Sequence, residues 1–340
     1  MIRVGIIGCG YWGPNLLRNF SMNPAFRVVA VAERKAEIRS KLSMAYPAVL
    51  MLEDAAELIA RQDIDAVVIA TPLMTHFPLA RDALNSGKHV LVEKPLAGST
   101  EEAEALIELA RRKNLTLMVD HTFLFTGAVQ RIEETVRSGK LGRVCYFDSM
   151  RANLGLFQPD VNCLWDLAPH DLSVINRLVD EDVVDIEASG YCHVNPRLPD
   201  MVYLTLHFAS NTIAHLNLSW MSPVKIRRFT IGGTSQMLVW DDLNQDQKIQ
   251  IYDSGIEFHA EDERATIIPD YRIGDVYSPR VSRQEALAGV VGHFADVIRA
   301  KTTSIMSGEE GARIVRILEQ AQKRLDASFD QLALRRPAAS

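Results

Sequence analysis

The chain has 340 residues, a formal net charge of −6 at pH 7, and a composition that is 47% hydrophobic and 24% charged. These values are typical of a globular protein long enough for two domains, and they exclude a disordered chain and a coiled coil. The net negative charge gives no sign of the basic surface that binds nucleic acid. No apolar run reaches the ~18 residues of a membrane span. We therefore expect a small-molecule ligand and neither a nucleic-acid nor a membrane partner.

The four cysteines are scattered along the chain and form no C-x-x-C pair: Cys9, Cys145, Cys163 and Cys192. This spacing argues against a zinc site and against a disulfide framework, so we expect no metal. The first residues enter an apolar strand directly and do not resemble a secretory signal. A cytoplasmic location is the expectation.

Up to about residue 120, short apolar runs alternate with amphipathic segments, the pattern of βαβ units in a parallel sheet. Strands are predicted at 2–7, 27–32, 65–70, 89–92 and 115–119, and helices near 12–22, 34–44, 54–61, 76–86 and 100–112. The fold class is therefore α/β, with an N-terminal Rossmann domain built on a doubly wound parallel sheet. Right-handed crossovers place all strand C-termini along one edge, where such sheets bind ligands.

The first predicted strand leads into a turn with glycines at positions 8, 10 and 13, and Tyr11 and Trp12 lie inside this turn. The first glycine allows a tight turn, the second lets a pyrophosphate approach the backbone, and the third lets the helix pack on the strand. Glu33 follows Gly13 by 20 residues and ends the second strand, where an acid can accept hydrogen bonds from the ribose hydroxyls. Gly8, Gly10, Gly13 and Glu33 together predict a dinucleotide site.

The identity of the dinucleotide depends on the residues around Glu33. A carboxylate there repels a 2′-phosphate and favours NAD. Arg34 and Lys35 follow it directly, however, and two cations are suited to pair with that phosphate. NAD is the expected cofactor, and NADP stays open.

Two further segments end predicted strands at the same edge. Thr71 and Pro72 form a loop ahead of His76, and this loop should border the cofactor; the alternative is that His76 caps or packs its helix. Glu93 and Lys94 precede Pro95, and the proline should restrict Lys94 to an extended backbone. The alternatives are a solvated lysine and a surface glutamate.

After residue 120 the pattern changes to strand-like runs joined by short polar turns, which is the spacing of a meander. Helices are predicted near 126–138, 166–179, 283–300 and 309–327, and strands at 143–151, 183–194, 201–209, 212–220, 225–231 and 236–240. We expect a C-terminal α+β domain with an open, mostly antiparallel sheet and helices on one face. The predicted domains are 1–121 and 122–340.

The segment from Trp165 to Asp171 contains both an acid and a histidine. With Asp166 as N-cap, Pro169 falls in the first turn, and Asp166 and His170 lie one turn apart on one face. A carboxylate near an imidazole suits it to general acid/base work. The alternative is that Asp166 is only a cap and His170 a hydrogen-bonded core residue.

Taken in order, the glycine turn, Ala70-Thr71-Pro72 with His76, Glu93-Lys94-Pro95, and Asp166 with His170 and Asp171 resemble the motifs of the Gfo/Idh/MocA oxidoreductase family. The resemblance covers nearly the whole chain. It implies a Rossmann domain joined to a C-terminal open-sheet domain, and oxidation of a sugar or cyclitol alcohol or reduction of the ketone. It also implies that Lys94 contacts the reacting hydroxyl and the nicotinamide, and that His170 is the acid/base.

The segments 10–20, 120–125, 151–155 and 165–171 resemble the branch of the family associated with nucleotide sugars and surface polysaccharides. Some ketoreductase relatives place a tyrosine at the His170 position, so a histidine favours dehydrogenase chemistry. His121, Arg151, Asn153 and Asp171 are the expected substrate-binding residues, although Arg151 and Asn153 could simply end a strand. The resemblance implies a UDP- or TDP-linked hexose, oxidised at C3.

The expected function is therefore NAD-dependent hydride transfer to and from a sugar carbon, with Lys94 and His170 as catalytic residues and Asp166 orienting the imidazole. A free sugar or inositol dehydrogenase and a deoxysugar ketoreductase are the enzymatic alternatives, and a non-catalytic NAD-binding regulator is the alternative from another class. Apolar residues recur at alternate positions in 201–220, and this pattern leaves a large sheet face that a second subunit could bury. We expect a homodimer or homotetramer formed through this sheet.

Overall fold

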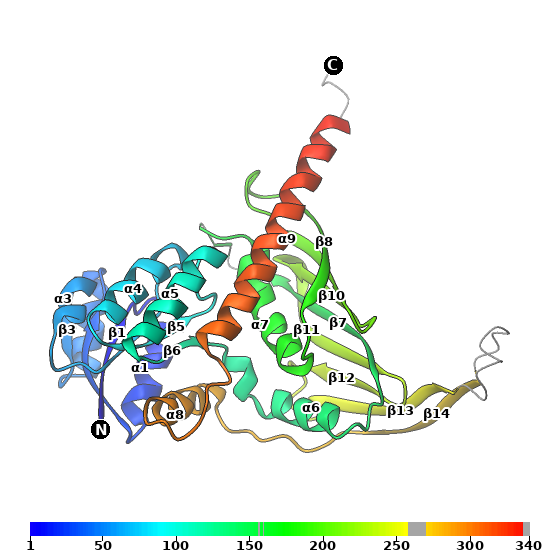
Figure 1. Cartoon of the computed structure of the whole chain (residues 1–340), viewed down its shortest axis with the longest axis horizontal. Helices are drawn as coiled ribbons and strands as arrows, with labels where there is room; N and C mark the ends of the chain where they lie inside the picture. The colour runs from blue at the N-terminus through cyan, green and yellow to red at the C-terminus, as the bar shows by residue number, and fades with distance from the viewer. Residues whose placement is uncertain (156, 159, 258–269, 336–340) are drawn as a thin grey trace. The chain divides into compact units, whose positions relative to one another are not determined.

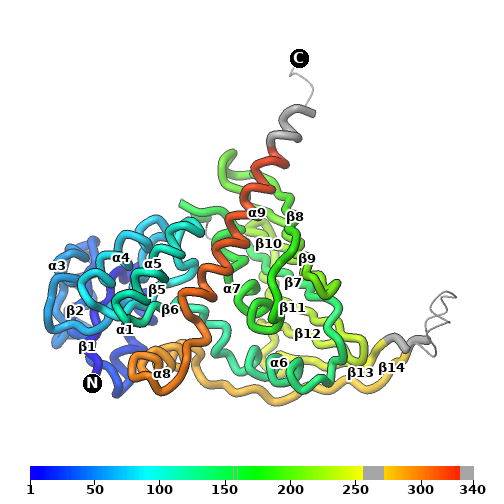
Figure 2. The backbone as a smooth tube through the Cα atoms, viewed as in Figure 1, coloured from blue at the N-terminus to red at the C-terminus, as the bar shows by residue number. Residues whose placement is uncertain are grey.

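The chain folds into two units and passes between them three times (Figures 1 and 2). Unit 1 consists of Met1–Phe125 and Gln284–Glu319, and unit 2 of Thr126–Arg283 and Gln320–Ser340. This computed structural model describes residues 1–155, 157–158, 160–257 and 270–335. Each unit contains one sheet with helices packed against it.

The sheet of unit 1 has six strands in the order β3-β2-β1-β4-β5-β6, all of them parallel. Its strands are β1 (Ile2–Ile7), β2 (Phe26–Ala32), β3 (Leu50–Leu52), β4 (Ala66–Ile69), β5 (His89–Glu93) and β6 (Leu117–Asp120). Outside β3, their side chains are mostly apolar and buried on both faces, as a parallel sheet between helices requires. The order reverses between β1 and β4, and ligands of doubly wound sheets bind at such a reversal.

Helices α3, α4 and α5 pack against one another in series, and α1 packs against α8. The helical segments of unit 1 are α1 (Gly13–Met22), α2 (Ala36–Ala45), α3 (Ala55–Ala60), η1 (Leu73–Thr75), α4 (His76–Asn85), α5 (Thr100–Lys113), η2 (Thr122–Phe125), α8 (Ala286–Ile298) and the first part of α9 (Gly308–Arg335). The predicted α/β Rossmann architecture is confirmed, and the short strand β3 is an addition to it.

The C-terminal helices return to unit 1 because their apolar faces complete its core. Phe294 of α8 stacks on Phe26 with ring centroids 6.0 Å apart and meets Phe20 edge-on at 6.4 Å. The backbone N–H of Val119 donates to the carbonyl of Met306 just ahead of α9. The prediction had placed 284–319 in a continuous second domain, 122–340, whereas these contacts join it to unit 1.

The sheet of unit 2 has eight strands in the order β14-β13-β12-β11-β7-β10-β9-β8. Its strands are β7 (Val144–Leu154), β8 (Val183–Tyr191), β9 (Met201–Phe208), β10 (Ile213–Ser219), β11 (Met221–Gly233), β12 (Met237–Asp241), β13 (Ile249–Glu257) and β14 (Asp270–Tyr277). Among the described strands of this sheet only β10 and β7 pair in parallel, so the predicted open, mostly antiparallel sheet is confirmed. Strands β13 and β14 were not predicted.

The described residues of unit 2 that precede β8 form two helices, α6 (Gly127–Arg137) and α7 (Cys163–Leu178). Helix α7 packs on β10, β9 and β7, and the leucine side chains of β9 and β10 are fully buried (Figure 1). The prediction that Asp166 caps this helix is wrong, because Asn162 is the N-cap and accepts hydrogen bonds from the amides of Leu164 and Trp165. Pro169 consequently lies inside the helix and not in its first turn.

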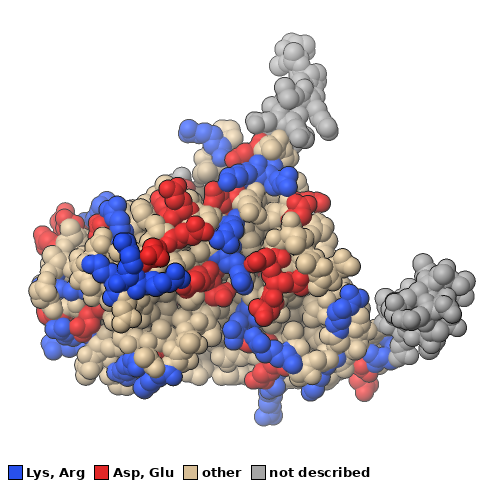
Figure 3. Space-filling view, in the orientation of Figure 1, with Lys and Arg blue, Asp and Glu red and all other residues tan. Residues whose placement is uncertain are grey.

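Acidic and basic side chains are interspersed on the face drawn in Figure 3. Several pair across neighbouring elements, such as Arg316 with Glu104 at 2.9 Å. No helix among the described residues is both long and apolar enough to cross a membrane.

Candidate active site

The glycine turn after β1 depends on the absence of side chains at two positions. Gly8 has φ +89°, and a Cβ there would lie 2.5 Å from the carbonyl oxygen of Ala70. A Cβ on Gly13 would lie 2.1 Å from the carbonyl oxygen of Gly8. Gly10 differs: apart from its own chain neighbours, no described residue has an atom within 4 Å of its added Cβ. The turn is thus closed by Gly8 and Gly13 and open over Gly10, where a ligand can approach the backbone.

Helix α1 begins at this turn without a side-chain cap. Trp12 is the N-cap residue and accepts no hydrogen bond from the first-turn amides through its side chain. The amides and the helix dipole therefore offer a site for an anion beside the open face of Gly10. These features fit the pyrophosphate of a dinucleotide.

Glu33, immediately after β2, is 9% exposed and bound at both carboxylate oxygens. Its Oε2 accepts the amide hydrogen of Cys9 at 2.7 Å, and its Oε1 accepts that of Lys35 at 2.9 Å. The side chain therefore ties the end of β2 to the glycine turn and leaves acceptor capacity at both oxygens. Arg34, by contrast, is exposed.

His76 lies at the start of α4, and its ring joins two loops. Its Nδ1 lies 2.7 Å from the carbonyl oxygen of Pro95, and its Nε2 lies 2.8 Å from that of Thr71. The side chain is 1% exposed. The ring thus links the Thr71-Pro72 loop to the segment that follows Lys94, which agrees with the alternative that His76 is a packed residue.

Glu93 ends β5, and Lys94 follows it with a cis peptide bond to Pro95. Glu93 pairs in register with Asp120, the last residue of β6. Burial, and next the neighbouring charge of Asp120, raise the pKa of Glu93 well above its usual range. The positive charge of Lys94 lowers the pKa of both Glu93 and Asp120, so its ammonium lies within electrostatic reach of both acids.

His121 follows Asp120 and is 2% exposed. Neither of its ring nitrogens has a hydrogen-bond partner among the described residues. Burial, with a smaller contribution from Lys94, lowers the pKa of His121 to about 3, so the ring is neutral at physiological pH. A buried ring with unbonded nitrogens is suited to a polar ligand.

On α7, Asp166 and His170 lie one helical turn apart. The indole Nε1 of Trp220 donates to Oδ2 of Asp166 at 3.2 Å. Trp220 lies between β10 and β11, and its ring meets Phe157 edge-on at 5.5 Å. The carboxylate of Asp166 is thus held by an aromatic residue far from it in the sequence.

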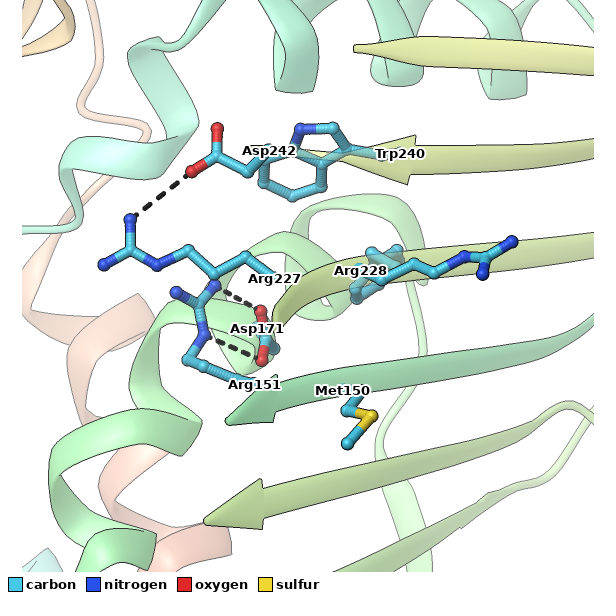
Figure 4. Close-up of a pocket in the computed structure, with 8 residues that line it drawn as sticks. Met150, Arg151, Asp171, Arg227, Arg228, Trp240 and Asp242 are labelled. Carbon is cyan, nitrogen blue, oxygen red and sulfur yellow. Dashed lines mark hydrogen bonds and ion pairs between the residues drawn. The ribbon is translucent and has the colours of Figure 1, made fainter. Parts of the chain in front are cut away.

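Arg151 of β7 and Asp171 of α7 form a buried ion pair, with Nη2 and Oδ1 2.6 Å apart and Nε and Oδ2 3.1 Å apart (Figure 4). Ser149 adds a hydrogen bond to Oδ2 of Asp171 at 2.9 Å. Arg151 and Asp171, two of the four predicted substrate-binding residues, therefore bind each other. Asn153, near the end of the same strand, is half-buried.

The arginines next to this pair do not form a cluster. Arg227 turns toward Asp242, with 3.4 Å between Nη1 and Oδ2, while Arg228 points away from it (Figure 4). Lys248 also contacts Asp242, at 3.1 Å. Arg227 and Lys248 thus share the carboxylate of Asp242.

Unit 1 therefore brings several predicted residues together: the glycine turn with Thr71 and Glu33, and His76 with Thr71 and Pro95. Sequence reasoning missed the roles of Asp120, Asn162 and Trp220. The position of Asp120 at a strand end beside Glu93 was a usable signal, whereas nothing in the sequence connects Trp220 to Asp166. The described parts of the chain hold no group of three His, Cys, Asp or Glu side chains arranged for a metal ion.

Comparison with known proteins assigns both parts of the chain to one family. Residues 2–121 match an oxidoreductase family with an NAD-binding Rossmann fold, and residues 129–239 match the GFO/IDH/MocA C-terminal domain. The chain is 30% identical over 334 residues to the UDP-N-acetylglucosamine 3-dehydrogenase of Acidithiobacillus ferrooxidans, which covers 96% of this chain and 98% of that protein.

A solved structure of a UDP-N-acetylglucosamine 3-dehydrogenase from that species aligns with a TM-score of 0.81 and 26% identity over 96% of this chain and 99% of that one. The chain is also 32% identical over 144 residues, 42% of each protein, to the dTDP-3,4-didehydro-2,6-dideoxy-alpha-D-glucose 3-reductase of Streptomyces violaceoruber. The expected resemblance is confirmed, and the chain belongs to the GFO/IDH/MocA family of NAD-binding oxidoreductases.

Proposed function

We propose that this oxidoreductase oxidises a secondary alcohol of a nucleotide sugar at C3, with NAD as the hydride acceptor. The observation that supports the substrate is the 30% identity, across 96% of the chain, to a UDP-N-acetylglucosamine 3-dehydrogenase. The open glycine turn and the buried carboxylate of Glu33 support NAD, since a carboxylate there repels a 2′-phosphate.

The cofactor would be held by residues at the carboxyl edge of the unit 1 sheet. The backbone around Gly8, Gly10 and Gly13, with Tyr11 and Trp12, would bind the pyrophosphate at the start of α1. Glu33 would accept hydrogen bonds from the ribose hydroxyls, and Arg34 would lie beside it. Thr71, Pro72, His76, Glu93 and Lys94 would border the nicotinamide, which when bound accepts or donates the hydride.

Three side chains would act on the reacting hydroxyl group of the substrate. Lys94 would bind the reacting hydroxyl and stabilise the negative charge that develops on its oxygen. His170 would take the hydroxyl proton, and Asp166, held by Trp220, would orient the imidazole. In the direction of ketone reduction the same imidazole returns the proton.

The expected substrate-binding residues divide into two groups by their contacts. Neither ring nitrogen of His121 is hydrogen bonded to a residue that the structure describes, so the ring is suited to bind a hydroxyl. Arg151 and Asp171 satisfy each other within β7 and α7, so we propose that they fix the backbone around Asn153 and His170. Asn153, half-buried at the strand end, would then contact the sugar directly.

The reductive direction is a second candidate function. The 3-reductase of Streptomyces violaceoruber acts on a deoxysugar nucleotide, and it matches part of this chain. Oxidation remains the proposal because the whole-length match is to a dehydrogenase. Free sugars and inositols are the alternative substrates, and competition by UDP would distinguish them from nucleotide sugars.

Substitution of Lys94 and His170 tests the catalytic assignment. We expect Lys94→Met and His170→Asn each to lower the rate of NAD reduction with nucleotide sugars by about 10²-fold or more, because each removes one charge-stabilising or proton-transferring group. Titration of NAD by fluorescence should still show binding in His170→Asn. Lys113→Met, an exposed lysine at the end of α5, is the control and should keep full activity. Full activity in both site variants would refute the assignment.

We also propose a cytoplasmic homodimer or homotetramer formed through the unit 2 sheet. Tyr203 and Ile213 are 40% and 38% exposed on neighbouring strands of this sheet, which supports burial by a second subunit. The four cysteines are free, as expected in a reducing compartment. Light scattering that gives the mass of a monomer would contradict the oligomer.

A further inference from the structure

Two carboxyl groups meet at the ends of β5 and β6 in unit 1. Glu93 and Asp120 are register partners on neighbouring parallel strands, so their side chains leave the same face of the sheet, and each carboxyl group influences the pKa of the other. Asp120 is 2% exposed. Ionised carboxylates have only acceptor atoms, so two neighbouring carboxyl groups can form a hydrogen bond only when one of them carries a proton.

The other contacts show which group is ionised. Asp120 accepts hydrogen bonds at both oxygens, from the Oγ1 of Thr122 at 2.6 Å and from the indole Nε1 of Trp12 at 3.2 Å. These donors favour the carboxylate form of Asp120. Burial raises the pKa of both acids, and the donors Thr122 and Trp12 lower that of Asp120, so Glu93 is the partner that takes the proton.

The charges around the pair agree with a single proton. Lys94 is the cation that acts on both acids, and the neighbouring His121 is neutral because its pKa is lowered to about 3. One carboxylate thus faces one ammonium. Ionisation of Glu93 as well would place a second negative charge next to the carboxylate of Asp120, which is 2% exposed and therefore poorly screened by water.

The pair also joins two parts of the proposed cofactor site. Trp12 belongs to the glycine turn after β1, and Lys94 follows β5. Asp120 contacts the first of these through the indole and the second through Glu93. We propose that Glu93 and Asp120 hold one proton between them at neutral pH, and that this pair is a positioning device that fixes Trp12 of the glycine turn relative to Lys94.

The direct test detects the proton itself. Infrared spectroscopy of the whole protein at neutral pH should show the carbonyl stretch of a protonated carboxylic acid, and labelling with ¹³C-glutamate should shift it. Glu93→Gln should remove this band, whereas Glu101→Gln, at an exposed position on α5, should leave it unchanged. Absence of a glutamate band that depends on Glu93 would overturn the shared proton.

The second test concerns positioning and uses NAD titration by fluorescence. Glutamine at position 93 can still donate to Asp120, so Glu93→Gln should lose less NAD affinity than Glu93→Ala. Glu93→Ala and Asp120→Ala remove the donor and the acceptor, and each should weaken NAD binding by about tenfold. Equal affinity in all four proteins would overturn the positioning role.

The second test rests on the proposed function, because it assumes that NAD binds at the glycine turn. The infrared test does not. If the wild-type protein fails to bind NAD, the cofactor assignment fails, while the glutamate band still decides whether the pair holds a proton. The two failures are thus distinguishable.

Discussion

At the scale of single residues, two buried histidines of unit 1 differ in their hydrogen bonds. The ring of His76 lies within 2.8 Å of two carbonyl oxygens, whereas His121 has no partner at either nitrogen among the described residues. The sequence named His76 as a site residue because it follows a predicted strand, and His121 as a substrate-binding residue through the family resemblance. Their partners are distant in sequence, so only the structure separates the ring that links two loops from the ring that is suited to a ligand.

Because the ring of His121 is neutral in the folded protein, we expect the free energy of unfolding to depend on pH. Its pKa is lowered to about 3 in the folded state, so the unfolded chain binds the proton more readily between pH 6.5 and 3. This group therefore destabilises the fold as pH decreases, by about 2 kcal/mol between pH 6.5 and 5. Urea unfolding at both pH values should show a smaller loss for His121→Gln than for the wild-type protein. An equal loss in the two proteins would contradict the lowered pKa.

The ion pair between Arg151 and Asp171 predicts a large effect of removing one partner. The two side chains are only 6% and 3% exposed, so Arg151→Met leaves a buried carboxylate without its cation. We expect a loss of about 3–5 kcal/mol in the free energy of unfolding, measured with urea. Arg131→Met, which removes a surface pair with Glu134 at 3.0 Å, should cost less than about 1 kcal/mol. Similar losses in both variants would show that the burial of Arg151 has no energetic consequence.

At the scale of elements, the sequence predicts the strands with buried apolar runs and misses those without them. Strands β1, β2 and β4 are nearly continuous apolar runs and were found within a few residues. The three-residue β3 is too short to give a pattern, and β14 contains charged residues that hide its alternation. The start of α7 was misplaced because Asp166 and Asn162 both satisfy the cap pattern, and only hydrogen bonds distinguish them.

The glycine turn allows folding and ligand binding to be separated. Gly10→Ala meets no protein atom within 4 Å, so its thermal stability should match that of the wild-type protein while NAD binding is lost. Gly13→Ala places a methyl group 2.1 Å from the carbonyl oxygen of Gly8 and should lower stability as well. Thermal unfolding and NAD titration of both variants check this. Normal NAD binding by Gly10→Ala would contradict the proposed approach of the pyrophosphate.

The cap of α7 predicts a smaller, local effect. Asn162→Ala removes the acceptor for the amides of Leu164 and Trp165, and we expect a loss of about 1 kcal/mol in the free energy of unfolding. Asp166→Asn keeps the helix start intact and should cost less stability while lowering activity. A greater loss of stability in Asp166→Asn would favour Asp166 as the residue on which the helix start depends.

At the scale of the whole molecule, the return of 284–319 to unit 1 is the feature that sequence reasoning could not supply. Helix α8 has an apolar face suited to either unit, and its place is decided by the contacts of Phe294 with Phe20 and Phe26. The sequence did predict the class of each sheet and the family of the whole chain. The proton shared by Glu93 and Asp120 required the strand register, which single-sequence patterns do not provide.

Hydride transfer from a sugar carbon to NAD is the central claim, and isotopic labelling tests it most directly. The full chain would be incubated with NAD and a UDP-hexose carrying deuterium at C3, and the nicotinamide nucleotide would be analysed by mass spectrometry. Our account predicts that deuterium appears in NADH with the wild-type protein and is strongly reduced with Lys94→Met and His170→Asn. Reduction of NAD without deuterium would contradict oxidation at C3, and absence of any reduction with sugars or nucleotide sugars would contradict the proposed function.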